Sequence, residues 1–411
     1  MTASHPTINR DRLFAQLVAL NDINRQPDGS CCRLALSDAD QQGRDLVVSW
    51  MKEIGLEVRI DRIGNIVGLQ SGAASTAPVM TGSHIDTVAT GGPLDGSLGV
   101  LAGLEVVRTL VEAGVATKRP LAVAVFTNEE GVRFQPDMLG SLMYAGGFSL
   151  EAALKSAAAD GTKLGDELVR IGYAGEAPCG ETRPYAYVEL HIEQGPVLDR
   201  LGEVLGAVED LQGISWQEIT VRGVSNHAGT TPMSLRHDAA YCAAKAAVFV
   251  HDLAKRMGGS QVATVGSVRL VPNLVNVIAR QATFTVDLRN TDETLLREAE
   301  SELANFLRDL ARDEQVSIDA RRLARTEPVR FDDQVLRQIE LAAHDLGYPI
   351  RRMTSGAGHD AQMMARICPT AMIFVPSVGG ISHNPNEHTA PEHVELGANI
   401  LLRTMQLLAN Q

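Results

Sequence analysis

Seven side chains that can bind metal ions or transfer protons follow short apolar runs of the sequence. They are His84, Asp86, Asp95, Glu129, Glu130, His191 and His383. Imidazole and carboxylate groups are common ligands of Zn, Mn, Co and Ni. The set therefore suggests a divalent metal site. Taken singly, each group is more often a satisfied polar residue or a turn residue, and spacing alone leaves that alternative open.

Two spacings within the set fit metal chemistry. His84 and Asp86 are two residues apart and would point to the same side of a strand. Asp86 would then accept a hydrogen bond from the His84 ring and fix its orientation. Glu129 and Glu130 are adjacent, so one side chain can bind metal while the other accepts a proton from water. A solvated surface pair is the alternative for the two glutamates.

The elements that would bring these groups together alternate along the chain. Apolar strands are expected to end near residues 86, 130, 193 and 377, with helices over 11–20, 39–54, 98–114 and 149–158 and a hairpin over 56–70. Continuous apolar strands between helices predict an α/β fold, a mostly parallel sheet sandwiched by helices. Because ligands of such sheets bind at the carboxyl ends of the strands, the candidate groups would converge there.

A different pattern occupies residues 214–326. Strands are expected over 214–223, 262–271, 279–290 and 316–324, and helices over 234–257 and 292–313. The order β-α-β-β-α-β is typical of a ferredoxin-like α+β domain. We predict an α/β domain of residues 1–212 and 328–411, interrupted by an inserted domain of residues 213–327.

The inserted domain carries three further candidates. His227 lies in a polar turn, SNHAGTTP, and Arg289 ends the strand FTVDLRN. An arginine at a strand end can hold a carboxylate through two parallel hydrogen bonds. Asn276, in PNLVNV, is a plausible companion. A helix-capping loop, an exposed salt bridge and a turn are the respective alternatives.

Composition excludes several classes of protein. The 411 residues carry a net charge of −13, which argues against a nucleic-acid or membrane-surface partner. We expect no transmembrane segment and no secretory signal. The five cysteines form no C-x-x-C pair and are expected to be reduced, in a cytoplasmic protein. Phosphate-binding loops and the serine-nucleophile elbow are absent from the sequence.

Nine motifs in order give the chain a resemblance to a known family. GSHIDTV, GGPLDGSLGVLAGLEV, TNEEGVRF, ELHIEQGPVL, GVSNHAGTTPM, VPNLVNV, VDLRNTD, SGAGHDAQ and PSVGGISHNPNEHT span most of the sequence. They resemble the hydantoinase/carbamoylase amidases of the di-metal aminoacylase and carboxypeptidase superfamily. Members include N-carbamoyl-L-amino acid hydrolases, β-ureidopropionases and allantoate amidohydrolases.

The resemblance implies a role for each candidate. Asp95 would bridge two divalent metal ions (Zn, Mn, Co or Ni), with His84 and His191 on one ion and Glu130 and His383 on the other. Glu129 would be the general base, with Asp86 beside the catalytic groups. Substrate would contact Gln194, His227, Asn276, Arg289 and the backbone of Gly356 and Gly358. His227 would come from the neighbouring subunit of a homodimer formed through the inserted domain, which also acts as a lid.

The implied reaction is hydrolysis of a ureido C–N bond. N-carbamoyl-β-alanine and N-carbamoyl-L-α-amino acids are equally good candidate substrates, because pockets discriminate poorly against one methylene. Allantoate is the alternative within the family. A peptidase or N-acyl-amino-acid deacylase on the same fold, and a non-catalytic binding protein, are the other hypotheses.

Overall fold

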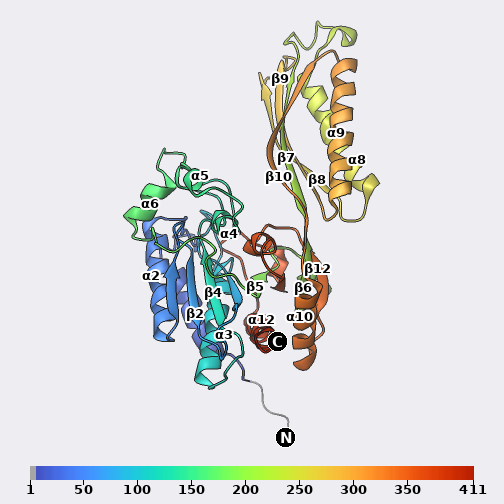
Figure 1. Cartoon of the computed structure of the whole chain (residues 1–411). Helices are drawn as coiled ribbons and strands as arrows, with labels where there is room; N and C mark the ends of the chain where they lie inside the picture. The colour runs from blue at the N-terminus through green and yellow to red at the C-terminus, as the bar shows by residue number, and fades with distance from the viewer. Residues whose placement is uncertain (1–5) are drawn as a thin grey trace. The chain divides into compact units, whose positions relative to one another are not determined.

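The computed structural model describes residues 6–411, which form two compact units. The α/β unit contains the chain up to Glu209 and from Phe331 onward, and the inserted unit is Asp210–Arg330. The sequence-based boundaries after residues 212 and 327 differ from these by three residues. Each unit has its own sheet (Figure 1). Among the described residues, no helix is long and apolar enough to cross a membrane.

The larger sheet is mixed and has nine strands in the order β1-β2-β4-β3-β5-β13-β6-β11, in which β12 also pairs with β6. All of it lies in the α/β unit except β11 and the last two residues of β6, which belong to the inserted unit at the junction. The strands are β1 (Glu57–Ile60), β2 (Ile66–Gln70), β3 (Val79–His84), β4 (Leu121–Phe126), β5 (Ala186–Ile192), β6 (Gly206–Leu211), β11 (Val329–Arg330), β12 (Arg351–Ser355) and β13 (Thr370–Val375). The helices are α1 (Arg10–Asn21), α2 (Asp38–Glu53), α3 (Ser97–Glu112), α4 (Leu139–Tyr144), α5 (Leu150–Leu154), α6 (Leu164–Arg170), α7 (Val197–Leu201), α10 (Asp333–Asp345), α11 (Asp360–Met364) and α12 (Pro391–Ala409).

The predicted α/β class is confirmed, and the parallel part of the sheet is its centre. Strands β4, β3, β5 and β13 run parallel, and every residue in them is buried. The predicted hairpin is β1–β2, which joins β4 antiparallel. The other side of the sheet, from β13 to β6 and β11, is also antiparallel. All four central strands therefore end at one edge.

Helices cover both faces of this central sheet. On one face, Gly103 of α3 lies against Thr81 and Val123, and Gly397 of α12 lies against Leu190. On the other face, the ring of Phe126 packs edge-on against Tyr144 of α4, with centroids 5.6 Å apart. These contacts explain why every residue of the four strands is buried, because both faces of the strands are in the core.

The inserted unit has the predicted β-α-β-β-α-β order. Its elements are β7 (Gly213–Arg222), α8 (Ala239–Met257), β8 (Val262–Val271), β9 (Gln281–Asn290), α9 (Glu293–Asp313) and β10 (Ser317–Thr326). The antiparallel sheet has the order β10-β7-β9-β8, and α8 and α9 lie along one face of it (Figure 1). Helix α8 begins later than expected, at Ala239, because the Asp238 side chain accepts from the backbone N–H groups of Ala240 and Tyr241.

The chain enters and leaves the inserted unit at adjacent positions. Strands β6 and β11 pair antiparallel, with Leu211 opposite Val329 and Asp210 opposite Arg330. The N–H of Phe331 also donates to the carbonyl of Glu209 at 2.9 Å. The insertion thus leaves from, and returns to, one edge of the larger sheet.

Candidate metal centre

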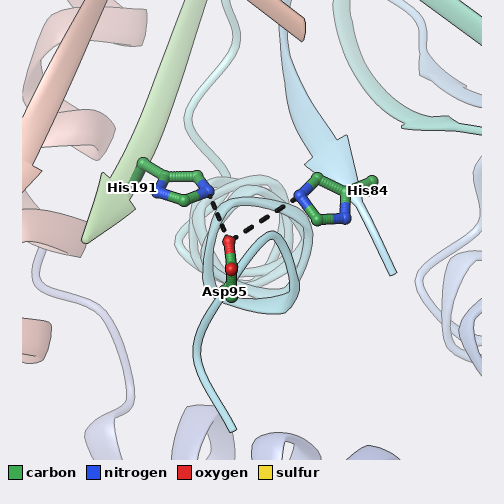
Figure 2. Close-up of side chains that lie close together, drawn as sticks. All are labelled: His84, Asp95 and His191. Atoms are coloured by element: carbon green, nitrogen blue, oxygen red, sulfur yellow. Dashed lines mark ion pairs between the residues drawn. The ribbon is translucent and has the colours of Figure 1, made fainter. Parts of the chain in front are cut away.

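The carboxylate of Asp95 lies at the centre of the candidate site. Its Oδ1 is 3.3 Å from Nε2 of His191 and 3.9 Å from Nε2 of His84 (Figure 2). Its Oδ2 is 3.0 Å from Nε2 of His383. Asp95 directly precedes the N-terminal end of α3, where the helix dipole favours a negative charge.

Two possible ligand groups share Asp95. One comprises His84, Asp95 and His191, all buried, and the other comprises Asp95, Glu130 and His383. Within each group, the ligand atoms all lie within 4.8 Å of one another. They are supplied by the ends of β3, β4 and β5, the start of α3 and the loop after β13. A carboxylate common to both groups is the arrangement needed to bridge two cations.

Backbone carbonyls hold both buried imidazoles in the form that binds metal. Nδ1 of His84 lies 2.9 Å from the carbonyl oxygen of Asp86, and Nδ1 of His191 lies 2.9 Å from that of Ile192. A carbonyl only accepts, so Nδ1 of each ring carries a proton, and in the neutral ring Nε2 keeps the lone pair that can bind a metal ion. Both lone pairs are on the side of Asp95, as in metal-binding histidines fixed by an outer partner.

Glu129 lies beside the ligand groups and belongs to neither. Its Oε2 is 3.5 Å from Nε2 of His84, and the residue is only 9% exposed. The preceding residue, Asn128, has a positive φ of 57° and turns the chain sharply after β4. This turn lets the side chains of Glu129 and Glu130 take different positions, as expected for two adjacent residues in a turning chain.

The electrostatics of the cluster fit bound cations. Burial and the charges of Asp360, Glu130 and Asp95 raise the pKa of Glu129 well above its usual range. Burial and the charge of Asp95 do the same to Glu130. Buried carboxylates this close need protons or positive charge to offset their repulsion. The residues present therefore suit two divalent ions, although they do not select one metal.

Asp86 departs from its expected role. Its carbonyl, and not its carboxylate, accepts from the ring of His84, since Oδ1 is 3.9 Å from Nδ1. The carboxylate accepts instead from the backbone N–H groups of Glu129 and Glu130, at 3.2 and 3.3 Å. Asp86 thus connects the end of β3 to the turn after β4. Sequence spacing could not distinguish the two acceptors of one residue.

Gln194 lies directly against the ligand groups. Its Nε2 donates to Oδ2 of Asp95 at 2.9 Å and lies 3.4 Å from Nε2 of His383. Gln194 and His383 both have positive φ, 57° and 54°. Such backbone strain clusters at functional sites, where surrounding contacts hold it.

Glu387 is a site residue that the sequence analysis missed. Its Oε1 accepts from the N–H groups of Leu94 and Asp95, at 2.9 and 3.1 Å. Its Oε2 accepts from the Ser382 hydroxyl at 2.8 Å. Glu387 thus joins the Asp95 loop to the loop that carries His383. The only signal for it was its place in the motif that contains His383.

Gly356 and Gly358 lie in the loop between β12 and α11. This loop reaches the ligands through His359, whose ring centroid is 4.5 Å from that of His191. Nε2 of His359 lies 3.0 Å from the Ser355 hydroxyl. Glu189, His191 and His359 form a further buried group, but Glu189 already accepts from the Ser83 hydroxyl at 2.7 Å.

The other three predicted residues belong to the inserted unit, where they fall into two places. His227 bridges to Val277, and the Asn276 carbonyl accepts from the N–H of Ala228 at 3.0 Å. These two turns adjoin the Arg222–Gln281 end of the β7–β9 pair. Arg289 lies at the other end, opposite Ile214, about 26 Å away at 3.3 Å per residue. The structure thus brings His227 and Asn276 together and separates Arg289 from them.

The exposed His227 and the partly buried Arg289 both have defined hydrogen-bond partners. Nδ1 of His227 accepts from the N–H groups of Gly229 and Thr230, at 3.1 and 3.2 Å. The proton of the neutral ring is therefore on Nε2, which makes that atom a donor. The guanidinium of Arg289 donates to Asp287 at 2.9 Å and lies 5.8 Å from the Trp216 ring.

Substitution of Gly96 by alanine should displace His84. Gly96 has φ +63°, and a Cβ there would lie 2.4–2.5 Å from three atoms of the His84 ring. We expect about 1–3 kcal/mol of destabilisation from the strained backbone and a weakened metal affinity. Thermal unfolding and cobalt(II) titration measure the two effects. Gly114→Ala is the matched control, since φ is +64° there but no atom lies within 4 Å of the added Cβ. Equal cobalt affinity in both variants would contradict the prediction.

The fold and the ligand groups define a metal-dependent hydrolase. The sequence pattern of peptidase family M20/M25/M40 matches residues 80–407, and the chain belongs to this family, whose members use two metal ions.

Similar proteins cover almost the whole chain. The N-carbamoyl-L-amino acid amidohydrolase of Geobacillus stearothermophilus is 39% identical over 407 residues, 98% of this chain and 99% of its own. The allantoate amidohydrolase of Escherichia coli is 36% identical, with 98% of each chain covered. The crystal structure of a hydantoinase/carbamoylase family amidase from Burkholderia multivorans is 43% identical, covers 98% of this chain and 99% of its own, and superposes with a TM-score of 0.95. The family predicted from the nine motifs is confirmed.

Proposed function

We propose that the protein hydrolyses the ureido C–N bond of N-carbamoyl amino acids, giving the amino acid, ammonia and carbon dioxide. The observation that carries this proposal is the pair of ligand groups sharing Asp95, with Glu129 beside them. Relatives of 38–39% identity named N-carbamoyl-L-amino acid amidohydrolases support the substrate class. A ureido carbonyl is a poor electrophile, so its hydrolysis needs the strong activation that such a site offers.

In this proposal His84, Asp95 and His191 hold one divalent ion, and Asp95, Glu130 and His383 hold the other. The ions would polarise the ureido carbonyl and lower the pKa of water at the site. Glu129 accepts the proton of the attacking water and returns it to the leaving nitrogen. Burial and the neighbouring carboxylates raise the pKa of Glu129, which favours return of the proton to the leaving nitrogen. Asp86 keeps Glu129 in place through the backbone.

Substrate binding is assigned to residues of both units. Gln194 lies next to the ligand groups and would contact the substrate there. The backbone of Gly356 and Gly358 would help to hold the substrate carboxylate. Arg289 would hold the substrate carboxylate with its planar guanidinium, which Asp287 orients. His227 would donate from Nε2 to the oxyanion, with Asn276 beside it.

We also infer that the protein is a homodimer with sites composed of two chains. Arg289 and His227 lie at opposite ends of one sheet, too far apart for a small substrate to touch both in one inserted unit. Strand β8 is a ten-residue edge, with Val262 and Val268 exposed on it and Val275 fully exposed in the loop that follows. An edge of this kind can pair with the same strand of a second copy. A cytoplasmic location stays a prediction.

Mixing two inactive variants tests the shared site. His227→Ala and Arg289→Ala should each lose about 100-fold or more in kcat/KM. Random exchange between equal amounts gives about half hybrid dimers, each with one complete site, so roughly a quarter of wild-type activity should return. Activity that stays at the level of the separate variants contradicts a site drawn from two chains.

A substrate panel tests the function itself. Metal-free protein, loaded separately with Zn, Mn, Co or Ni, would be assayed on N-carbamoyl-L- and D-amino acids, N-carbamoyl-β-alanine, allantoate, a dipeptide and an N-acetyl amino acid. We expect the highest kcat/KM on an N-carbamoyl amino acid and no turnover after chelation. Allantoate is the second candidate because of the relative of 36% identity. Faster cleavage of the dipeptide or acetyl compound, or full activity without metal, would overturn the proposal.

A further inference from the structure

Arg33 is a fully buried arginine next to the candidate metal centre. Its side chain has no ion pair with a carboxylate within the described chain, and its guanidinium donates to neutral acceptors. Nε donates to the carbonyl of Ile85 at 2.7 Å, Nη1 to the carbonyl of Leu20 at 2.9 Å and Nη2 to the hydroxyl of Ser97 at 3.1 Å. The residue is 0% exposed.

Two of these acceptors belong to the segments that supply metal ligands. Ile85 lies between His84 and Asp86, and the carbonyl of Asp86 orients the His84 ring. Ser97 begins α3, and its N–H donates to the carbonyl of Asp95 at 2.6 Å. One rigid guanidinium thus links the end of β3 to the start of α3.

The backbone of Arg33 adds a second link to the same strand end. Its N–H donates to the Thr87 hydroxyl at 2.8 Å, and its carbonyl accepts from the N–H of Thr87 at 3.0 Å. Segment 84–87 is therefore held against residue 33 by both main chain and side chain.

The fold leaves specific room for this side chain. A Cβ on Gly43 of α2 would lie 2.9 Å from Cδ of Arg33 and 3.3 Å from Leu20. Burying a charge with only neutral partners is costly, and an apolar side chain would fill the space at a lower cost. Packing alone therefore does not explain why this buried residue is an arginine. Its hydrogen bonds to the carbonyl of Ile85 and the hydroxyl of Ser97 do explain it.

We propose that Arg33 is a positioning residue that holds the His84 strand end and the Asp95 loop at the spacing required to bind a metal ion. The proposal rests on the metal centre proposed above and adds a residue from the N-terminal region, outside the 80–407 match to the family pattern. None of the hydrogen bonds of Arg33 goes to a proposed metal ligand. Arg33 acts through the carbonyl of Ile85 and the hydroxyl of Ser97.

Cobalt(II) titration of metal-free protein tests this role. Arg33→Lys keeps the charge but cannot span three acceptors with one planar fork. We expect the affinity for one of two cobalt equivalents to fall about 10- to 100-fold, as when outer partners of metal ligands are removed. Gly43→Ala, which crowds Arg33 without changing it, should shift the affinity in the same direction. Thermal unfolding of the metal-free variants is measured alongside.

The matched control is Arg12→Lys. Arg12 donates to the buried Glu105 at 2.6 and 2.8 Å and so joins α1 to α3 away from the ligand segments. It should lower the unfolding temperature and leave cobalt affinity unchanged. If Arg33→Lys and Gly43→Ala lose stability but bind two cobalt ions as tightly as wild type, Arg33 is only structural and the inference is overturned. Wild-type protein that binds no cobalt would contradict the metal centre itself.

Discussion

Asp95→Asn should remove both metal ions at once and lower kcat/KM by more than about 1,000-fold, since metal ions contribute several kcal/mol to such reactions. Asp95 is common to the two ligand groups, whereas every other member belongs to one of these two. Asparagine keeps the size of the side chain but loses the charge, and its amide end cannot bridge two cations as a carboxylate does. Metal analysis after dialysis gives the stoichiometry directly.

The control is His383→Ala, which removes a ligand from one group only. His383 is also half-exposed, with 50% of its side chain accessible, so its loss leaves the buried core intact. This variant should retain one equivalent of metal. Two equivalents bound to Asp95→Asn, or none bound to His383→Ala, would contradict a bridge at Asp95.

Glu129→Gln should lower kcat by about 100- to 10,000-fold, the usual contribution of a general base, and leave both metal ions bound. Glutamine preserves the volume of the side chain but cannot accept a proton from water. KM should change little, because we assign Glu129 no role in substrate binding. Steady-state kinetics and metal analysis on the same preparation separate the two effects.

Glu130→Gln is the comparison for that experiment. The two glutamates are adjacent and follow the same turn after β4, but only Glu130 belongs to a ligand group. Its substitution should cost metal as well as rate. If Glu129→Gln loses a metal ion, or keeps wild-type kcat, Glu129 is not the base.

The central sheet and its ligand edge could be predicted from the sequence because their signal is local. Strands β3, β4, β5 and β13 are mostly apolar, and each has its candidate ligand near its carboxyl end or within about eight residues after it. Parallel strands with one orientation bring those groups to one edge whatever the details of packing. The strands of the inserted unit could also be predicted, since β9 alternates buried and half-buried residues without interruption.

What holds the ligands in place could not be predicted. Arg33 occurs in CCRLAL, a stretch without periodicity, and its partners lie 13, 52 and 64 residues away. Glu387 acts on backbone N–H groups almost 300 residues earlier. Two of the three guanidinium contacts of Arg33 are to main-chain carbonyl groups, which every residue type has. Candidate metal ligands and bases can therefore be recognised in a sequence more readily than the residues that position them.

The adjacent entry and exit of the inserted unit bear on how the chain could have acquired it. Because Leu211 faces Val329 across an antiparallel pair, a short hairpin could close the larger sheet at this point without moving any strand. A whole domain can therefore be gained or lost there as a module, with the order of the ligand-bearing strands untouched. Exchange of the inserted unit at this junction would leave the candidate metal ligands of the larger sheet in place.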